Sequence, residues 1–130
     1  MFTTYNEVKK ALNDNTVNCV GLVSHYLNQI EEKKELNAFV EVFTETAMQK
    51  AKQVDEKLKQ GKAGKLAGFV IGIKDNICYK NHKVSGASKI LEGFESLFDA
   101  TVVERLLAED AIIIGRLNCD EFAMGSSNEN

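Results

Sequence analysis

The chain has 130 residues, 44% of them hydrophobic and 27% charged, which fits one soluble domain with a sizeable core. The net charge is −3 and lysines are interleaved with glutamates, so a basic surface for gripping nucleic acid is excluded. We expect a cytoplasmic location, because no stretch could span a bilayer and the first ten residues lack the order of a secretory signal.

Two helices are predicted at the start of the chain. Thr4 and Glu7 have the spacing of a capping box, which predicts a short helix up to about Leu12. In residues 16–33 the apolar side chains recur at helical spacing and leave His25 on the solvent side. Packing of this second helix against the core is the simpler interpretation, and docking of a partner protein is the alternative.

A short strand and a longer helix follow. Residues 37–43 alternate and are rich in β-branched and aromatic side chains, which predicts a strand. Thr44 is expected to cap the next helix, which extends to about Gln60, and Gly61 is expected to end it in a left-handed conformation. The charged residues on the outer face of this helix, Asp55 among them, are predicted to be solvated surface.

Two strongly apolar segments predict buried strands, one at 68–73 and one at 111–115. Between them lie a long loop with one helical turn near 88–91 and a helix that begins at a second capping box, Thr101 to Glu104. Three consecutive isoleucines exclude a strand with one wet face, so the strands should form a parallel sheet covered on both faces. The predicted fold class is α/β: a helical N-terminus, then a parallel or mixed sheet flanked by helices.

Polar residues follow both strands, in the runs Lys74-Asp75-Asn76 and 116–118. Ligands of open α/β sheets bind beyond the carboxyl ends of the strands, so we expect the site there if the two strands are neighbours. A lysine at such a place is either a surface group with a covered alkyl stem or a catalytic base, and a base needs burial. Asp75 should point away from Lys74 and hydrogen-bond loop backbone.

Serines offer hydroxyl groups at two places, in the run Gly125-Ser126-Ser127 and around Ser85 and Ser88. Serines in such glycine-containing runs are usually turn or cap residues. A Ser/His/Asp set is not predicted, because His25 lies on a helix surface and His82 in a polar loop. A lysine would have to replace histidine as the activating base. Three cysteines and two histidines provide no zinc ligand set.

Three segments, 72–76, 99–106 and 113–127, together resemble the amidase signature family in order and spacing. Within that family, the run Asp-Glu-Phe-Ala-Met-Gly-Ser-Ser at 120–127 is similar to the glutamine-hydrolysing subunits of tRNA-dependent amidotransferases. The resemblance implies a triad of a serine, a second serine in a cis peptide and a lysine, in which Lys74 is the base. It also implies that Gly125, Ser126 and Ser127 bind substrate.

The same resemblance implies that residues 1–130 are the N-terminal portion of a single amidase domain. Both catalytic serines would then lie in a later Gly/Ser-rich segment, so this chain alone is expected to be inactive and to expose apolar surface. The complete subunit is expected to hydrolyse glutamine and to need no cofactor. ATP, Mg²⁺ and most tRNA contacts would belong to partner subunits. The alternatives are part of a standalone amidase for small amides, or a non-catalytic α/β assembly module.

Overall fold

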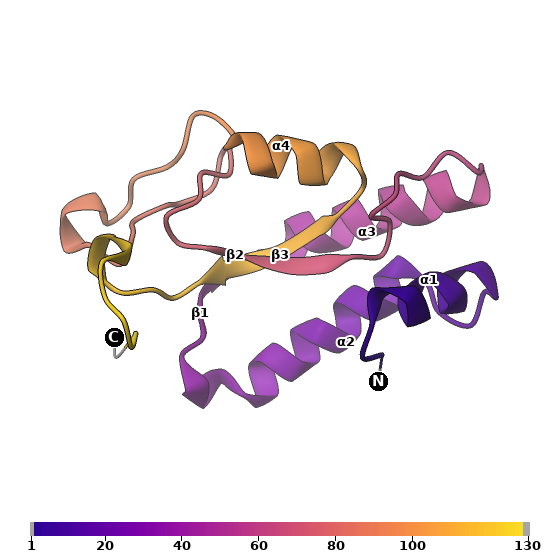
Figure 1. Cartoon of the computed structure of the whole chain (residues 1–130), viewed down its shortest axis with the longest axis horizontal. Helices are drawn as coiled ribbons and strands as arrows, with labels where there is room; N and C mark the ends of the chain where they lie inside the picture. The colour runs from indigo at the N-terminus through magenta and orange to yellow at the C-terminus, as the bar shows by residue number, and fades with distance from the viewer. Residues whose placement is uncertain (1, 129–130) are drawn as a thin grey trace.

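The computed structural model describes residues 2–128, which form a three-stranded mixed sheet between helices (Figure 1). The strand order is β1 (Phe39–Val42), β3 (Ile112–Leu117), β2 (Val70–Lys74). β2 runs parallel to β3, whereas β1 is antiparallel to it. The predicted α/β class is confirmed, and the two strands that carry the polar runs are indeed neighbours.

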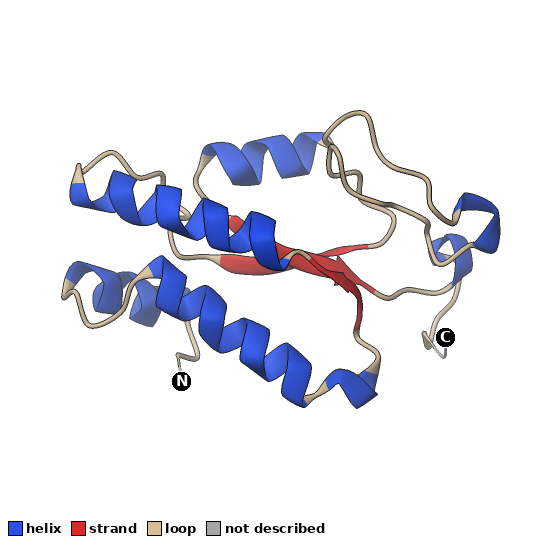
Figure 2. Ribbon diagram, turned by 180° about the vertical axis from the view of Figure 1, so that it is seen from behind, coloured by secondary structure: helices blue, strands red, loops and turns tan. Residues whose placement is uncertain are grey.

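Four α-helices surround this sheet in the described part of the chain. They are α1 (Tyr5–Asn13), α2 (Cys19–Glu32), α3 (Thr44–Lys59) and α4 (Thr101–Ala108). Figure 2 shows α2 and α3 extending alongside each other. Residues of these two helices pack on one face of β3, and residues of α4 pack on the other face. The described residues also contain three short 3₁₀ turns, η1 (Lys34–Leu36), η2 (Lys89–Leu91) and η3 (Glu121–Ala123). No helix within residues 2–128 has the length and apolar character needed to cross a membrane.

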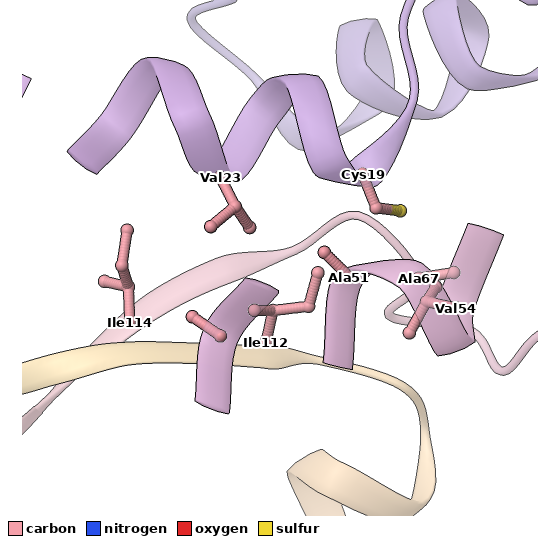
Figure 3. Packing of buried hydrophobic residues seen from close by; sticks show 8 residues of the cluster. Cys19, Val23, Ala51, Val54, Ala67, Ile112 and Ile114 are labelled. Atoms are coloured by element: carbon pink, nitrogen blue, oxygen red, sulfur yellow. The ribbon is translucent and has the colours of Figure 1, made fainter. Parts of the chain in front are cut away.

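The three isoleucines of β3 anchor both halves of the core. Ile112 and Ile114 pack with Cys19 and Val23 of α2, as Figure 3 shows, and with small residues of α3. Ile113 points to the opposite face, where it packs with residues of α4. Each buried isoleucine stabilises the fold by roughly 1.5–3 kcal/mol. The prediction of a strand covered on both faces is therefore confirmed.

The start of α2 differs from the prediction, because the helix begins at Cys19 and not at residue 16. Asn18 is the N-cap, and its side chain accepts a hydrogen bond from the Gly21 N–H at 2.7 Å. Asp55 of α3 accepts two more bonds, from the N–H groups of Cys19 at 2.7 Å and Val20 at 3.1 Å. The prediction that Asp55 is solvated surface is therefore wrong, because it caps the neighbouring helix.

Two of the predicted caps are also wrong. Thr44 is the first residue of α3, and the N-cap is Phe43, which makes no side-chain capping bond. The Phe43 N–H bonds instead to the Ile114 carbonyl at 2.8 Å, so sheet pairing fixes the backbone there. Thr101 is likewise the first residue of α4, which lacks a side-chain cap. The capping box of Thr4 is confirmed, as is the left-handed Gly61, with a φ of 66°.

A buried carboxylate ties α3 to the turn before β3. Asp110 is 1% exposed and accepts hydrogen bonds from the Nζ atoms of Lys57 at 2.7 Å and Lys50 at 3.1 Å. Its second oxygen accepts a bond from the Gly64 N–H at 2.8 Å. Burial raises the pKa of Asp110, but these hydrogen bonds outweigh burial and the pKa lies below its ordinary value. These lysines are therefore not merely solvated surface.

Apolar side chains are exposed at the end of the sheet away from α1. Ile90 is 86% exposed, Leu97 82% and Met124 86%. Exposed side chains of this size in one region usually mark a surface that another part of a protein covers. This observation agrees with the expectation that the chain exposes apolar surface.

Candidate functional site

Strands β2 and β3 end at the same edge of the sheet, and their polar residues meet there. Lys74 is the last residue of β2 and pairs with Leu117. Its side chain is exposed, whereas the next residue, Asp75, is completely buried. This alternation follows from strand geometry, in which successive side chains point to opposite faces. The predicted separation of Lys74 from Asp75 is therefore confirmed.

Lys74 faces the segment 118–128, and together they form an open hollow of about 320 Å³. The residues that line it are Lys74, Asn118, Cys119, Asp120, Ala123, Gly125, Ser126, Ser127 and Asn128. All four residues that we selected from the sequence therefore line one hollow. Within residues 2–128, no hydrogen bond or ion pair holds the Lys74 ammonium group. Its exposure also means that these residues alone do not supply the burial that a lysine base needs.

Asp120 shapes the wall of the hollow opposite Lys74. Its Oδ2 atom accepts a hydrogen bond from the Asn128 N–H at 3.2 Å, and its carbonyl accepts one from the Ala123 N–H at 2.7 Å. Gly125 lies so close to this side chain that an added Cβ would stand 2.1 Å from Asp120 Oδ2. A side chain at position 125 would therefore force Asp120 to move, whereas glycine lets this segment pass close to Asp120 and bring Ser126 and Ser127 to the hollow.

The buried carboxylate of Asp75 binds the loop next to the hollow. Its Oδ1 accepts a bond from the Ser85 N–H at 3.0 Å, and its Oδ2 accepts bonds from the Ser85 hydroxyl at 2.6 Å and the Ala87 N–H at 3.0 Å. The guanidinium of Arg116 also pairs with Asp75. Burial raises the pKa of Asp75, but the Ser85, Arg116 and backbone hydrogen bonds outweigh burial and lower it. The predicted bonding to loop backbone is confirmed.

Arg116 connects all three strands, a role that the sequence did not reveal. It lies in β3, is 6% exposed, and pairs through Nη2 with Glu41 of β1 at 3.1 Å. Through Nη1 it pairs with Asp75, directly after β2. The one signal available in the sequence was a charged residue that directly follows an apolar strand. That signal does not identify the partners, which lie 41 and 75 positions away.

Several other candidate groups are engaged elsewhere. The Ser85 hydroxyl donates to Asp75, and the Ser88 hydroxyl donates to Glu121 at 3.4 Å. His25 is exposed, as predicted, and the His82 ring stacks on Tyr79 with 3.9 Å between the ring centroids. The structure thus engages the two serines in hydrogen bonds, stacks His82 on an aromatic ring and leaves His25 on the surface, and it joins none of them to Lys74.

Cys119 lines the hollow but is only 3% exposed. Burial raises the pKa of Cys119, and the nearby Lys74 charge only partly opposes this effect. The thiol is therefore protonated at neutral pH, which makes it a poor nucleophile. Within residues 2–128, no three His, Cys, Asp or Glu side chains come together as a metal site.

A larger hollow, of about 660 Å³, lies at the start of α2 beside Asn18, His25 and Lys59. The helix terminus there could attract an anion only through free N–H groups. Asn18 and Asp55 already accept the bonds of the first three of these groups, so this hollow offers no comparable chemistry. The edge that carries Lys74 remains the better candidate.

Comparisons with known proteins identify a family and several relatives. Residues 21–130 match the family model described as Amidase. The chain is 49% identical, over 99% of its length, to the A subunit of the glutamyl-tRNA(Gln) amidotransferase of Chlorobaculum parvum. It is also 49% identical, over 98% of its length, to the protein of the same name in Chlorobium chlorochromatii. The chain spans 27% of the length of each of these relatives.

A solved structure has a similar fold. The native peptide amidase from Stenotrophomonas maltophilia superposes with a TM-score of 0.85 at 26% identity. That comparison covers 93% of this chain and 26% of the amidase.

Proposed function

This chain belongs to the amidase family, and from that premise we propose that it is part of the glutamine-hydrolysing subunit of a glutamyl-tRNA(Gln) amidotransferase. The subunit would release ammonia from glutamine, and the complex would use it to convert Glu-tRNA(Gln) to Gln-tRNA(Gln). The observation that carries this proposal is the 49% identity to the amidotransferase protein over nearly the whole chain, against 26% to the peptide amidase.

Lys74 is the general base in this proposal. Its neutral amine takes a proton from a bridging serine, which takes the proton of a second serine as that oxygen bonds to the amide carbon of glutamine. Collapse of the intermediate breaks the carbon–nitrogen bond, and the returned proton allows ammonia to leave. Water then cleaves the acyl ester to give glutamate. Gly125, Ser126 and Ser127 bind the substrate on the opposite wall of the hollow.

The two serines belong to a later part of the longer protein, of which residues 1–130 form the N-terminal portion of a single amidase domain. That later part also covers Lys74 and supplies the burial that its role requires. The chain on its own is inactive, because loss of one member of such a triad lowers turnover by about 10⁶-fold. The length of the relatives supports the assignment of the serines to a later part of the protein, because the chain spans 27% of the length of the Chlorobaculum parvum protein.

Subunits B and C are the partners in this proposal. The chain itself holds no cofactor, and ATP and Mg²⁺ bind to the partner that activates the tRNA-linked glutamate. Most tRNA contacts are made by that partner as well, which fits the net charge of −3 on this chain. The complex works in the cytoplasm.

Ammonia release by the full-length subunit, expressed with subunits B and C, tests the proposal. The three subunits should co-purify, and glutamine should be hydrolysed with a higher kcat/KM than simple aliphatic or aryl amides. A preference for simple amides without co-purification would instead indicate a standalone amidase. Serine-reagent-sensitive hydrolysis by the 130-residue chain would contradict its proposed inactivity. Folded full-length protein without any hydrolysis would favour an assembly module.

A further inference from the structure

Two segments form the walls of the hollow: the end of β2, with Lys74, and the segment 118–128, with Ser126 and Ser127. A loop that does not line the hollow joins these two walls. The Gly86 N–H donates to the Asp75 carbonyl at 2.8 Å, and the Gly86 carbonyl accepts from the Phe122 N–H at 2.7 Å. The strand end that carries Lys74 is thereby linked to the segment that carries Ser126 and Ser127. The distance between the proposed base and the proposed substrate-binding residues therefore depends on where Gly86 lies.

This loop has a conformation that needs support. Gly86 and Ala87 both have a φ of 55°, in the left-handed region. A left-handed residue with a Cβ costs about 1–2 kcal/mol, so Ala87 would favour another conformation without a compensating contact. That contact is the bond from the Ala87 N–H to Asp75 Oδ2 at 3.0 Å, next to the two bonds from Ser85. The carboxylate therefore selects the loop geometry that places Gly86.

Arg116 in turn fixes the carboxylate. Its guanidinium pairs with Asp75 on one side and with Glu41 on the other. Removing one partner of a buried pair destabilises a protein, but replacing the whole pair by apolar residues is often neutral. Such a pair therefore contributes little net stability, and its main effect is to hold nearby groups in one conformation. Here the group that it holds is the loop between the two walls.

We propose that Asp75 is a positioning residue for Lys74: through the loop of Ser85 to Ala87 and through Phe122 it holds the Ser126–Ser127 wall in register with the lysine. The inference deepens the proposed glutamine hydrolysis and rests on it. Asp75 does not touch the substrate. It acts through the backbone of the loop, and it must stay ionised to accept four donors at once.

Asp75→Asn tests this role, because the amide keeps the shape but replaces one acceptor oxygen by a donor. Asp110→Asn is the matched control: Asp110 is equally buried and paired with cations, but it precedes β3 and lies at the opposite end of the sheet. Both variants should lower the urea midpoint of unfolding. In the full-length subunit, Asp75→Asn should lower kcat for glutamine about 100-fold with KM changed less than threefold. Asp110→Asn should leave kcat within twofold.

Amide hydrogen exchange in the full-length subunit, followed by mass spectrometry of its peptides, provides a readout that needs no activity. Asp75→Asn should speed exchange of the Ala87 and Phe122 amides about tenfold or more relative to the core amides of Ile112 and Ile113. Asp110→Asn should leave that ratio unchanged. If Asp75→Asn does not fold, Ser85→Ala removes the hydroxyl bond to Asp75, together with the long contact of 3.5 Å from Arg116 Nη1 to the same hydroxyl. It should shift the same ratio and kcat in the same directions.

The outcomes separate the two proposals. If the loop amides are released and kcat falls with KM nearly constant, the positioning role is supported. If kcat falls equally in Asp110→Asn, or if the Phe122 amide keeps its protection in Asp75→Asn, the role is overturned. If the wild-type subunit hydrolyses no glutamine, the proposed function fails by itself, and exchange at Ala87 and Phe122 still decides whether Asp75 holds the two walls together.

Discussion

The cap that Asp55 provides to α2 gives the sharpest test of how this fold is held together. Its carboxylate accepts the N–H groups of Cys19 at 2.7 Å and Val20 at 3.1 Å, across 36 and 35 positions of sequence. The change Asp55→Ala leaves both donors without an acceptor, and the half-buried helix start gives water only partial access to them. Two helices that pack on the same core thereby lose two charged hydrogen bonds between them.

The magnitude follows from the two bonds. A net hydrogen bond to a charged group contributes about 1.5–3 kcal/mol, and loss of an N-cap side chain costs about 0.5–2 kcal/mol. Because water can partly solvate the freed donors, we expect Asp55→Ala to lower the free energy of unfolding by about 2 kcal/mol. For a domain of this size that corresponds to a fall in Tm of roughly 5–10 °C.

Urea unfolding followed by far-UV circular dichroism measures this loss directly. Glu56→Ala is the matched control, because Glu56 is the next residue and forms only an exposed ion pair with Lys59. Exposed pairs contribute less than about 1 kcal/mol, so this control should be nearly neutral. Equal midpoints for Asp55→Ala and Glu56→Ala would refute the interhelix cap and the structural argument built on it.

Two further predictions concern titratable groups. The pKa values of Asp75 and Asp110 lie below the ordinary aspartate value, so the unfolded chain takes up protons first as the pH falls. Their contribution to stability should therefore be complete above about pH 4 and lost progressively below it; urea midpoints that stay constant from pH 5 to pH 2.5 would contradict this. Burial, reinforced by Asp55, raises the pKa of Cys19 to about 12, which leaves roughly 10⁻⁴ of this thiol ionised at pH 8. Cys19 should therefore resist iodoacetamide in the native chain and react on unfolding, as peptide mass spectrometry can establish.

The sheet could be predicted from the sequence because its signals are local. The apolar segments that form β2 and β3 are long enough to predict buried strands, and a polar run marks the end of each strand. The caps could not be predicted equally well. Threonine is a common N-cap residue, yet Thr44 and Thr101 are the first residues of their helices. Sheet pairing fixes the backbone of the residue before Thr44. Helix α2 takes part of its cap from Asp55 of another helix.

The site was predictable in a different way. Lys74 and the run from Gly125 to Ser127 are about 50 positions apart. Their spacing in the sequence did not predict a common site, whereas their resemblance to the amidase signature family did. The structure brings them to one hollow. The network of Asp75, Arg116 and Glu41 could not be predicted, because Glu41 lies in β1, Arg116 in β3 and Asp75 directly after β2, and only the folded chain brings them together.

The most direct test of the account is the role of Lys74 in the full-length subunit. Ammonia release from glutamine should fall at least about 10⁴-fold in Lys74→Ala. It should fall similarly in Lys74→Arg, because a guanidinium keeps the positive charge but cannot be deprotonated to act as a base. Circular dichroism should show that both variants remain folded. Undiminished ammonia release by Lys74→Ala would contradict the central claim that this lysine is the base.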